Sequence, residues 1–244
     1  MRVPRVYCPR LRVGANTLDE EESHHATRVL RVGVGQEVLL FDGAGREARG
    51  QVESVTRTQT IVAAESLTAY PFDLHLRLTL AVAMTKMHRQ SYLVEKCTEL
   101  GVAGLWPIAT ERSVAQPAEA AVEKWSRRAV EACKQSGRAW VPSIETSQPL
   151  DRALARHCEF AAAFAAVPGA LRPFDAALAA APQDARVLVF VGPEGGWSPA
   201  ELAAFESWGI TSVALSPTTL RTETAAVTVC AAVALSSCPR PTAP

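Results

Sequence analysis

The stretch Val187–Gly196 reads VLVFVGPEGG, and it decides the fold class. Its first five residues are all apolar, which is typical of a strand that is buried on both faces of a parallel sheet. Shortly after it, Ser198-Pro199-Ala200-Glu201 combines a capping box with proline at the first helical position, so a helix is predicted to begin there. A strand, a glycine-rich loop and a helix in this order predict an α/β domain with loops at the strand ends.

The alternation of strand and helix extends in both directions from this stretch. Leucines at every second position over Leu74–Leu80 predict a strand. Gly101 and Gly209 are natural stops for the helices that precede them. Further strands are predicted at 103–108, 160–167 and 212–215, and helices at 92–100, 118–136, 174–181 and 224–236.

The first 70 residues follow a different pattern. Short apolar or alternating runs at 38–41, 51–55 and 60–64 predict closely spaced strands, and helical spacing occurs only at 23–30. Such strands favour a small barrel over a βαβ unit. Thr68–Pro71 is the predicted linker. The predicted organisation is therefore a barrel domain at 1–70, an α/β domain at 74–238 and a disordered tail at 239–244.

Composition narrows the class of protein. The chain has 244 residues, of which 48% are hydrophobic, and no apolar run reaches the length of a membrane span. The basic N-terminus has no apolar signal core after it, so we expect a cytoplasmic protein. Six cysteines are scattered without a CxxC pair, and we therefore predict no metal site.

The charge balance is neutral overall and basic in places. A net charge of zero gives no global signal for nucleic acid. Two basic groups stand out locally, and each is open to two interpretations, a solvated face or a surface for a polyanion. They are Arg2, Arg5, Arg10 and Arg12, and Lys124, Arg127, Arg128, Lys134 and Arg138.

In the loop Gly192–Gly196, three glycines and a proline leave backbone N–H and C=O groups uncovered by side chains, so a ligand could approach them closely. Glu194 is its only charge and would repel a phosphate, which favours a cationic or neutral ligand. Neither GxGxxG nor GxxxxGK[ST] occurs in the chain, so the common nucleotide-binding fingerprints are not met. A tight structural turn would use the same residues.

A second loop, with LRTETA at Leu220–Ala225, also follows a predicted strand. Ligands bind beyond the carboxyl ends of parallel strands, so the two loops are expected to form one site. Arg221 could bind a phosphate or stabilise an anionic base, and Glu223 suits the positive end of the following helix. Alternatively, Arg221 pairs with Glu223 or Glu194 and simply closes the loop.

These motifs, together with others along the chain, resemble the SPOUT-class 16S rRNA uracil-N3 methyltransferases. The other matches are MRVPRVY at 1–7, HATRVLR at 25–31, LFDG at 40–43, EKCTELGV at 95–102, ERSV at 111–114 and CKQSGR at 133–138. The resemblance covers both predicted domains in order.

The resemblance implies a PUA-like RNA-binding barrel, a SPOUT domain with a C-terminal trefoil knot, and a homodimer that methylates 16S rRNA of the small ribosomal subunit. It implies S-adenosylmethionine as the cofactor, held by Val191, Gly192, Pro193, Glu194, Gly195, Gly196, Leu215, Ser216, Leu220, Thr224 and Ala225. We assign catalysis to Arg221, with Glu223 as a candidate base. The candidate RNA contacts are Arg2, Arg5, Arg28, Arg31, Arg89, Arg112 and Arg138.

The chain departs from the family pattern just before LRTETA. Relatives usually read LGxR there, whereas this chain carries Ser216 and Thr218 in place of the glycine and the arginine. Two alternatives therefore stay open beside the uracil-N3 enzyme. One is a SPOUT ribose 2′-O-methyltransferase, and the other is an RNA-binding relative that has lost catalysis.

Overall fold

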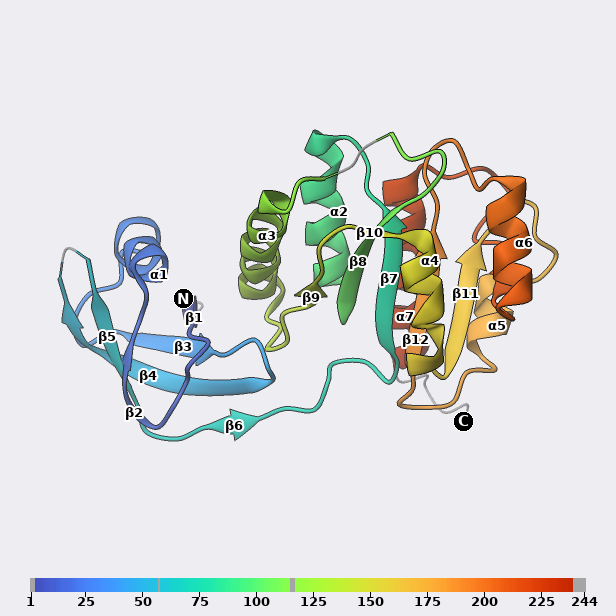
Figure 1. Cartoon of the computed structure of the whole chain (residues 1–244). Coiled ribbons are helices and arrows are strands. Elements are labelled where there is room, and N and C mark those ends of the chain that lie inside the picture. The colour runs from blue at the N-terminus through green and yellow to red at the C-terminus, as the bar shows by residue number, and fades with distance from the viewer. Residues whose placement is uncertain (1–2, 57, 115–116, 239–244) are drawn as a thin grey trace, which may run out of the picture. The chain divides into compact units, whose positions relative to one another are not determined.

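The computed structural model describes residues 3–56, 58–114 and 117–238, and these fold as two compact units (Figure 1). One unit contains the described residues up to Asp73 together with Val130–Val141. The other contains Leu74–Ala129 and the described residues from Pro142 onward. The C-terminal part of one long helix, α3 (Ala120–Ser136), therefore belongs to the first unit.

The first unit is built on a six-stranded sheet in the order β1-β3-β4-β5-β2, with β6 paired to β4. The β1–β3 pair is parallel and the other pairs are antiparallel. In this order β1 and β2 are the two edge strands, and among the described residues they do not pair with each other. Closure of the sheet into a barrel therefore stays a prediction. The elements are β1 (Arg5–Tyr7), β2 (Gly14–Thr17), α1 (Glu20–His24), the π-helical turn η1 (His25–Val29), β3 (Glu37–Phe41), β4 (Arg46–Val55), β5 (Thr60–Ala64) and β6 (Thr68–Ala69).

A buried ion pair anchors α1 within this unit. Asp19 caps the helix by accepting a hydrogen bond from the backbone N–H of Glu22 at 2.8 Å. Glu22 is buried, pairs with Lys134 of α3, and accepts a hydrogen bond from the backbone of Tyr7 at 3.0 Å. Burial raises the pKa of the Glu22 carboxyl, and the Lys134 ammonium opposes that shift.

The second unit contains a seven-stranded sheet whose pairs are all parallel, in the order β10-β8-β7-β12-β11-β13 with β9 paired to β8. Its strands are β7 (Arg77–Ala83), β8 (Gly104–Ala109), β9 (Ser143–Ile144), β10 (Gln148–Pro149), β11 (Ala162–Ala166), β12 (Arg186–Val191) and β13 (Thr211–Val213). Its helices, beside the N-terminal part of α3, are α2 (Met87–Glu99), α4 (Leu150–Ala155), the 3-10 turn η2 (His157–Glu159), α5 (Phe174–Leu178), α6 (Pro199–Ser207) and α7 (Thr222–Ser237).

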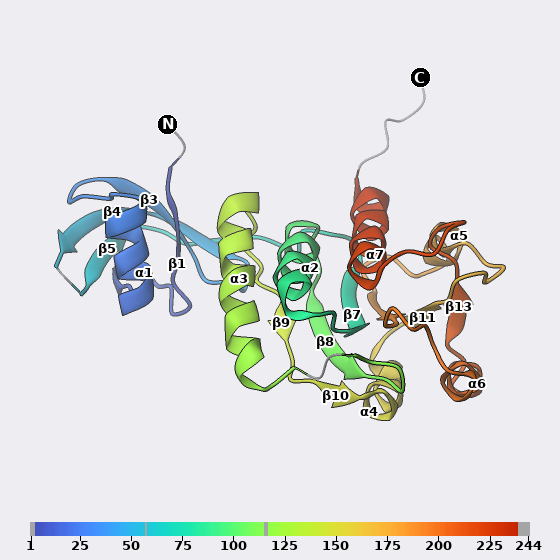
Figure 2. The same cartoon turned by 90° about the horizontal axis from the view of Figure 1, so that it is seen from above.

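Helices cover both faces of this sheet. Figure 2 shows α2 and α7 on one side and α4 and α6 on the other. The α4–α6 side packs alternate strand residues, such as Leu188 and Phe190, against Phe205 of α6. The neighbouring positions Val187, Val189 and Val191 are also buried, so β12 is apolar and buried on both faces from Val187 to Val191, after the exposed Arg186 at its start.

The expected α/β pattern is confirmed, with shifts at several boundaries. β12 and α6 begin within one residue of their predicted starts, and Ser198 forms the predicted capping box with Glu201. The strand predicted from Leu74 begins only at Arg77, since Leu74 instead packs over Gly101. The strand predicted to reach Leu215 ends at Val213. The tail at 239–244 lies outside the described residues.

Candidate active site

The carboxyl ends of three neighbouring strands, β11, β12 and β13, open into one hollow of the second unit. The hollow encloses about 570 Å³ of space, including the part that is open to solvent, and this is within the range of small-molecule sites. Its walls come from the loops after these strands and the start of α7. The lining residues are Ala166, Val167, Pro168, Val191, Gly192, Pro193, Glu194, Gly196, Trp197, Leu215, Ser216, Thr218, Thr219, Leu220, Thr222 and Ala225.

The loop after β12 is shaped by the indole of Trp197. A Cβ atom at Gly192 would lie 2.9 Å from Cε2 of this ring, so only glycine leaves room for it. Gly196 has a φ of 68°, a left-handed conformation that favours glycine, and its N–H donates to the carbonyl of Pro193 at 2.9 Å. Glycine is therefore required at position 192 to leave room for the Trp197 ring, and it is favoured at position 196 by the left-handed backbone conformation.

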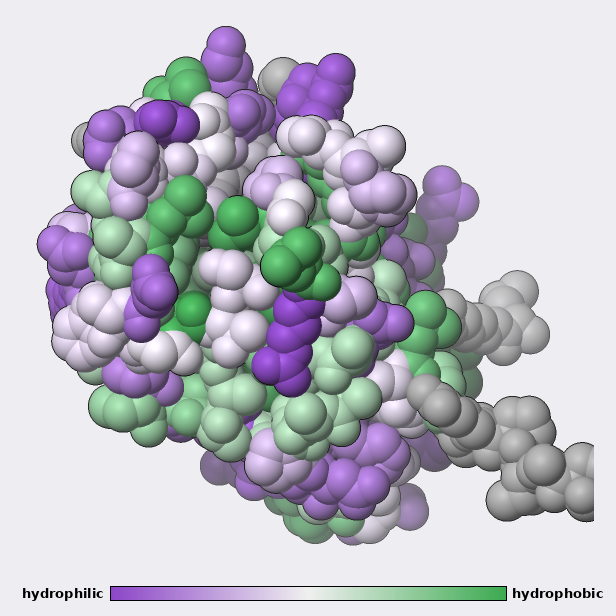
Figure 3. All heavy atoms as spheres, turned by 90° about the vertical axis from the view of Figure 1, so that its right-hand side faces the viewer, coloured by the Kyte–Doolittle hydropathy of each residue, from purple (hydrophilic) through white to green (hydrophobic). Residues whose placement is uncertain are grey.

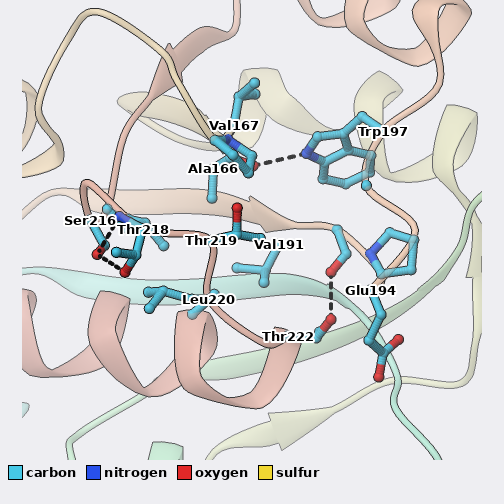
Figure 4. Close-up of a pocket in the computed structure, with 16 residues that line it drawn as sticks. Ala166, Val167, Val191, Glu194, Trp197, Ser216, Thr218, Thr219, Leu220 and Thr222 are labelled. Atoms are coloured by element: carbon cyan, nitrogen blue, oxygen red, sulfur yellow. Dashed lines mark hydrogen bonds between the residues drawn. The ribbon is translucent and has the colours of Figure 1, made fainter.

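The start of α7 is joined to that loop. The Oγ1 of Thr222 donates to the carbonyl oxygen of Gly192 at 2.9 Å (Figure 4). On the opposite side of the hollow, Ser216 and Thr218 form a hydroxyl pair at 3.0 Å, and Ser216 Oγ also accepts from the N–H of Thr218 at 3.2 Å. The departure from the family pattern therefore lies in the wall of the hollow.

Charge at the hollow is sparse and negative. Among the described lining residues only Glu194 carries a charge. Arg221 is exposed at the N-cap of α7, and Glu223 is buried in its first turn. Neither residue is part of the lining, although Thr222 between them is. The wall therefore suits a neutral or cationic ligand better than a phosphate.

Glu223 pairs with Arg89 rather than with Arg221. Its Oε1 lies 3.2 Å from Nη1 of Arg89, which is in the first turn of α2. The other oxygen, Oε2, is buried and has no hydrogen-bond partner among the described residues. The structure thus brings together a predicted RNA contact and a predicted catalytic residue.

The predicted RNA-contact arginines occupy different environments. Arg28 and Arg31 are exposed in the first unit, and Arg2 lies outside the described residues. The buried guanidinium of Arg5 pairs with Glu47 at 2.7 Å, and that of Arg138 pairs with Asp73 at 2.6 Å. These two arginines therefore have a structural role within the first unit.

Most of the predicted cofactor residues meet at the hollow, and some do not. Gly195 and Thr224 are not among the lining residues, whereas the other nine predicted residues are. Sequence reasoning missed the segment Ala166–Pro168, as well as Trp197 and Thr222, and it named Leu215, Ser216 and Leu220 but not Thr218 and Thr219 between them as cofactor residues. The carboxyl end of the strand predicted at 160–167 could have been added to the candidate site as a third strand end. That it lies beside the end of β12, however, follows from the strand order of the sheet, which the sequence does not give.

Two general features of the described residues bear on the class of protein. None of their helices has the length and apolar character needed to cross a bilayer. No group of three or more histidine, cysteine or acidic side chains among them is arranged to hold a metal ion, and a metal-free site stays a prediction.

Two family models match the chain. One describes an RNA methyltransferase domain and matches residues 73–234, and the other describes an RNA methyltransferase PUA domain and matches residues 18–63. The first of these covers most of the second unit, including every residue that lines the hollow.

Named relatives agree with these models. The ribosomal RNA small subunit methyltransferase E of Mycobacterium bovis is 35% identical over 225 residues, which is 88% of this chain and 84% of that protein. A Legionella pneumophila methyltransferase solved with its bound cofactor SAM is 28% identical, with a TM-score of 0.87 and coverage of 97% and 98% of the two chains. The Neisseria gonorrhoeae ribosomal RNA small subunit methyltransferase E, bound to S-adenosyl methionine, is 27% identical with a TM-score of 0.82, and the match covers 95% of this chain and 96% of that one.

Proposed function

The chain belongs to the ribosomal RNA small subunit methyltransferase E family, and from this premise we propose that it transfers a methyl group from S-adenosylmethionine to N3 of a specific uridine in 16S rRNA. The single observation that supports this best is the hollow at the ends of β11, β12 and β13, in which Glu194 is the one charged residue of the described lining. Its position follows the rule for ligand sites in parallel sheets.

The residues of the hollow fit this cofactor. Val191, Leu220 and Ala225 offer apolar surface to an adenine ring, and Glu194 offers a negative charge to a cationic ligand. The bare backbone at Gly192 and Gly196 allows close approach. We propose that the predicted set holds the cofactor, with Trp197, Thr218, Thr219 and Thr222 added. When bound, S-adenosylmethionine would supply an electrophilic methyl group.

The chain's own residues would prepare the acceptor. N3 of uracil carries a proton in its neutral form, so transfer requires its loss, and the resulting negative charge spreads over the flanking carbonyl oxygens. We assign the stabilisation of that charge to the exposed guanidinium of Arg221. Glu223 is the candidate base. Arg89 engages its Oε1, and its Oε2 is buried without a hydrogen-bond partner among the described residues.

RNA would be bound by a PUA-like barrel at 1–70, and the transfer would take place in a SPOUT domain at 74–238 whose last segment is knotted. Arg28 and Arg31 are exposed and can meet phosphates. Specificity would come from the shape of the rRNA and from one unstacked base. We place the reaction in the cytoplasm, on the small subunit or its RNA.

We also propose that the enzyme acts as a homodimer. Leu171 is fully exposed at 100%, and a second hollow nearby is lined by Ala170, Phe174, Pro217 and Ala232 among others. Figure 3 shows apolar side chains gathered between polar ones on the face of the second unit that lies to the right in Figure 1. Multi-angle light scattering would measure the mass in solution, and a monomer at micromolar concentration would contradict this part of the proposal.

The function is tested by methyl transfer to small subunits from cells that lack the endogenous enzyme. Nuclease digestion and mass spectrometry would then locate the methyl group. We expect it on a uracil base. A methyl group on a ribose would favour the 2′-O-methyltransferase. RNA binding without heat from S-adenosylmethionine in a calorimetric titration would favour a relative that has lost catalysis.

A further inference from the structure

The turn after β8 packs against the glycine-rich loop after β12. The turn is closed by two hydrogen bonds, from the N–H of Thr110 to Oγ of Ser113 at 3.0 Å and from the N–H of Ser113 to the carbonyl of Thr110 at 3.1 Å. It contains the motif ERSV at 111–114, which no step of the proposed reaction uses. The turn is therefore a candidate for a further role at the site.

Arg112 joins this turn to the loop through a single nitrogen. Its Nη1 donates to the carbonyl oxygen of Gly195 at 3.0 Å and to that of Trp197 at 3.2 Å. Hydrogen bonds from a charged donor are stronger than neutral ones, so this guanidinium holds two points of one short loop. The guanidinium contacts backbone carbonyls next to the hollow, in contrast to the RNA contact that we predicted from the sequence.

Two further contacts fit the turn and the loop together. A Cβ atom at Gly195 would lie 3.1 Å from Cβ of Arg112, so the missing side chain allows the close approach. The backbone N–H of Glu111 donates to Oε1 of Glu201 at 2.9 Å, and Oε2 of the same carboxylate accepts from the N–H of Ser198 at 2.7 Å. The turn after β8 is thus hydrogen-bonded both to the glycine-rich loop and to the first residues of α6, the helix that follows this loop.

The loop needs such support because of its own composition. Three of its six residues, Gly192–Trp197, are glycine, and glycine loses more conformational freedom on ordering than any other residue. A loop that is ordered before the ligand arrives binds it more tightly, because the ligand does not have to order it.

We propose that Arg112 is a positioning residue that holds Gly192–Trp197 in the conformation that binds S-adenosylmethionine. The inference rests on the proposed function, since it names the same cofactor. It assigns Arg112 to cofactor affinity rather than to RNA affinity. A lysine at this position would keep the charge but lose the rigid planar group that is aimed at two carbonyls.

Calorimetric titration of S-adenosylmethionine into the full-length protein tests this directly. We expect R112A to raise the Kd about tenfold, from the loss of two hydrogen bonds, and R112K to raise it less. The matched control is R152A, which removes an exposed arginine of α4 and should leave the Kd within about twofold. In kinetics, R112A should raise KM for the cofactor while kcat at saturation stays within about twofold.

The results that would contradict the role of Arg112 can be distinguished from one another and from a failure of the proposed function. A wild-type Kd in R112A, combined with weaker binding to a 16S rRNA fragment, would overturn the proposal and restore the RNA contact. A fall in kcat with an unchanged KM would also overturn it. If R112A does not fold, R112K and G195A carry the test, and a wild-type Kd in both would reject the proposal. If the wild type itself does not bind S-adenosylmethionine, the proposed function fails first and this inference fails with it.

Discussion

Trp197 donates a hydrogen bond from its indole Nε1 to the main-chain carbonyl of Ala166 at 2.9 Å, and so joins the end of β11 to the loop after β12 (Figure 4). The ring also meets Phe205 of α6 edge to face, with 4.8 Å between the ring centroids. One side chain therefore fixes two strand ends and the following helix around the hollow. The absence of a side chain at Gly192 leaves room for this ring.

Replacing Trp197 with phenylalanine should weaken cofactor binding about three- to tenfold, since the variant loses one hydrogen bond worth about 1 kcal/mol but keeps an aromatic contact with Phe205. Calorimetry with S-adenosylmethionine measures the change. Trp208→Phe is the matched control, because Trp208 is 43% exposed at the C-cap of α6 and does not line the hollow. Equal effects in both variants would show that the Ala166 bond is unimportant for binding.

Much of the second unit could be predicted because its signals are local. The apolar run of β12, the capping box at Ser198 and the stop at Gly209 each depend on neighbouring residues alone, and the structure confirms them. Short elements gave no such signal. β1 has three residues and β10 has two, too few for a period of two to be recognised, and they form by pairing with strands far along the chain.

The partners of the site residues could not be predicted either, because they also lie far away along the chain. Arg112 and Gly195 are 83 positions apart, and nothing in the sequence indicates that this arginine meets that carbonyl. Likewise, LRTETA placed Arg221 beside Glu223, whereas the carboxylate pairs with Arg89 of α2. The residue types were visible in the sequence, but their partners depend on strand order and on helix packing.

Arg221→Ala should lower kcat by about 10²–10³-fold if its guanidinium stabilises the charge that develops on the base. Cofactor affinity should change little, because Arg221 is not among the residues that line the hollow. Single-turnover methyl transfer and calorimetry separate the two effects, and Arg221→Lys should keep part of the activity. Turnover at the wild-type rate in the alanine variant would remove the proposed role.

The stability of the first unit should depend on alkaline pH through Cys133. Burial raises the pKa of this thiol from 9.0 to about 11, so the folded state keeps a proton that the unfolded chain has already lost. The contribution is fully present below about pH 9 and is lost as the pH rises towards 11; two pKa units correspond to about 3 kcal/mol.

Urea unfolding between pH 7 and 11 tests this for the wild type and Cys133→Ala. The difference between their free energies of unfolding should be constant below pH 9 and should narrow above it. Cys158→Ala serves as the control, because Cys158 is exposed. A difference that does not change with pH would refute the assignment.

Arg89→Ala should destabilise the second unit by about 1–3 kcal/mol, because it leaves the buried carboxylate of Glu223 without its ion-pair partner. Adding Glu223→Gln should recover part of that loss, since a neutral amide costs less to bury than an unpaired charge. Urea unfolding of both single variants and the double variant closes the thermodynamic cycle. Strict additivity would mean that the pair contributes no coupling energy, and Glu223 would then not depend on Arg89 for its position.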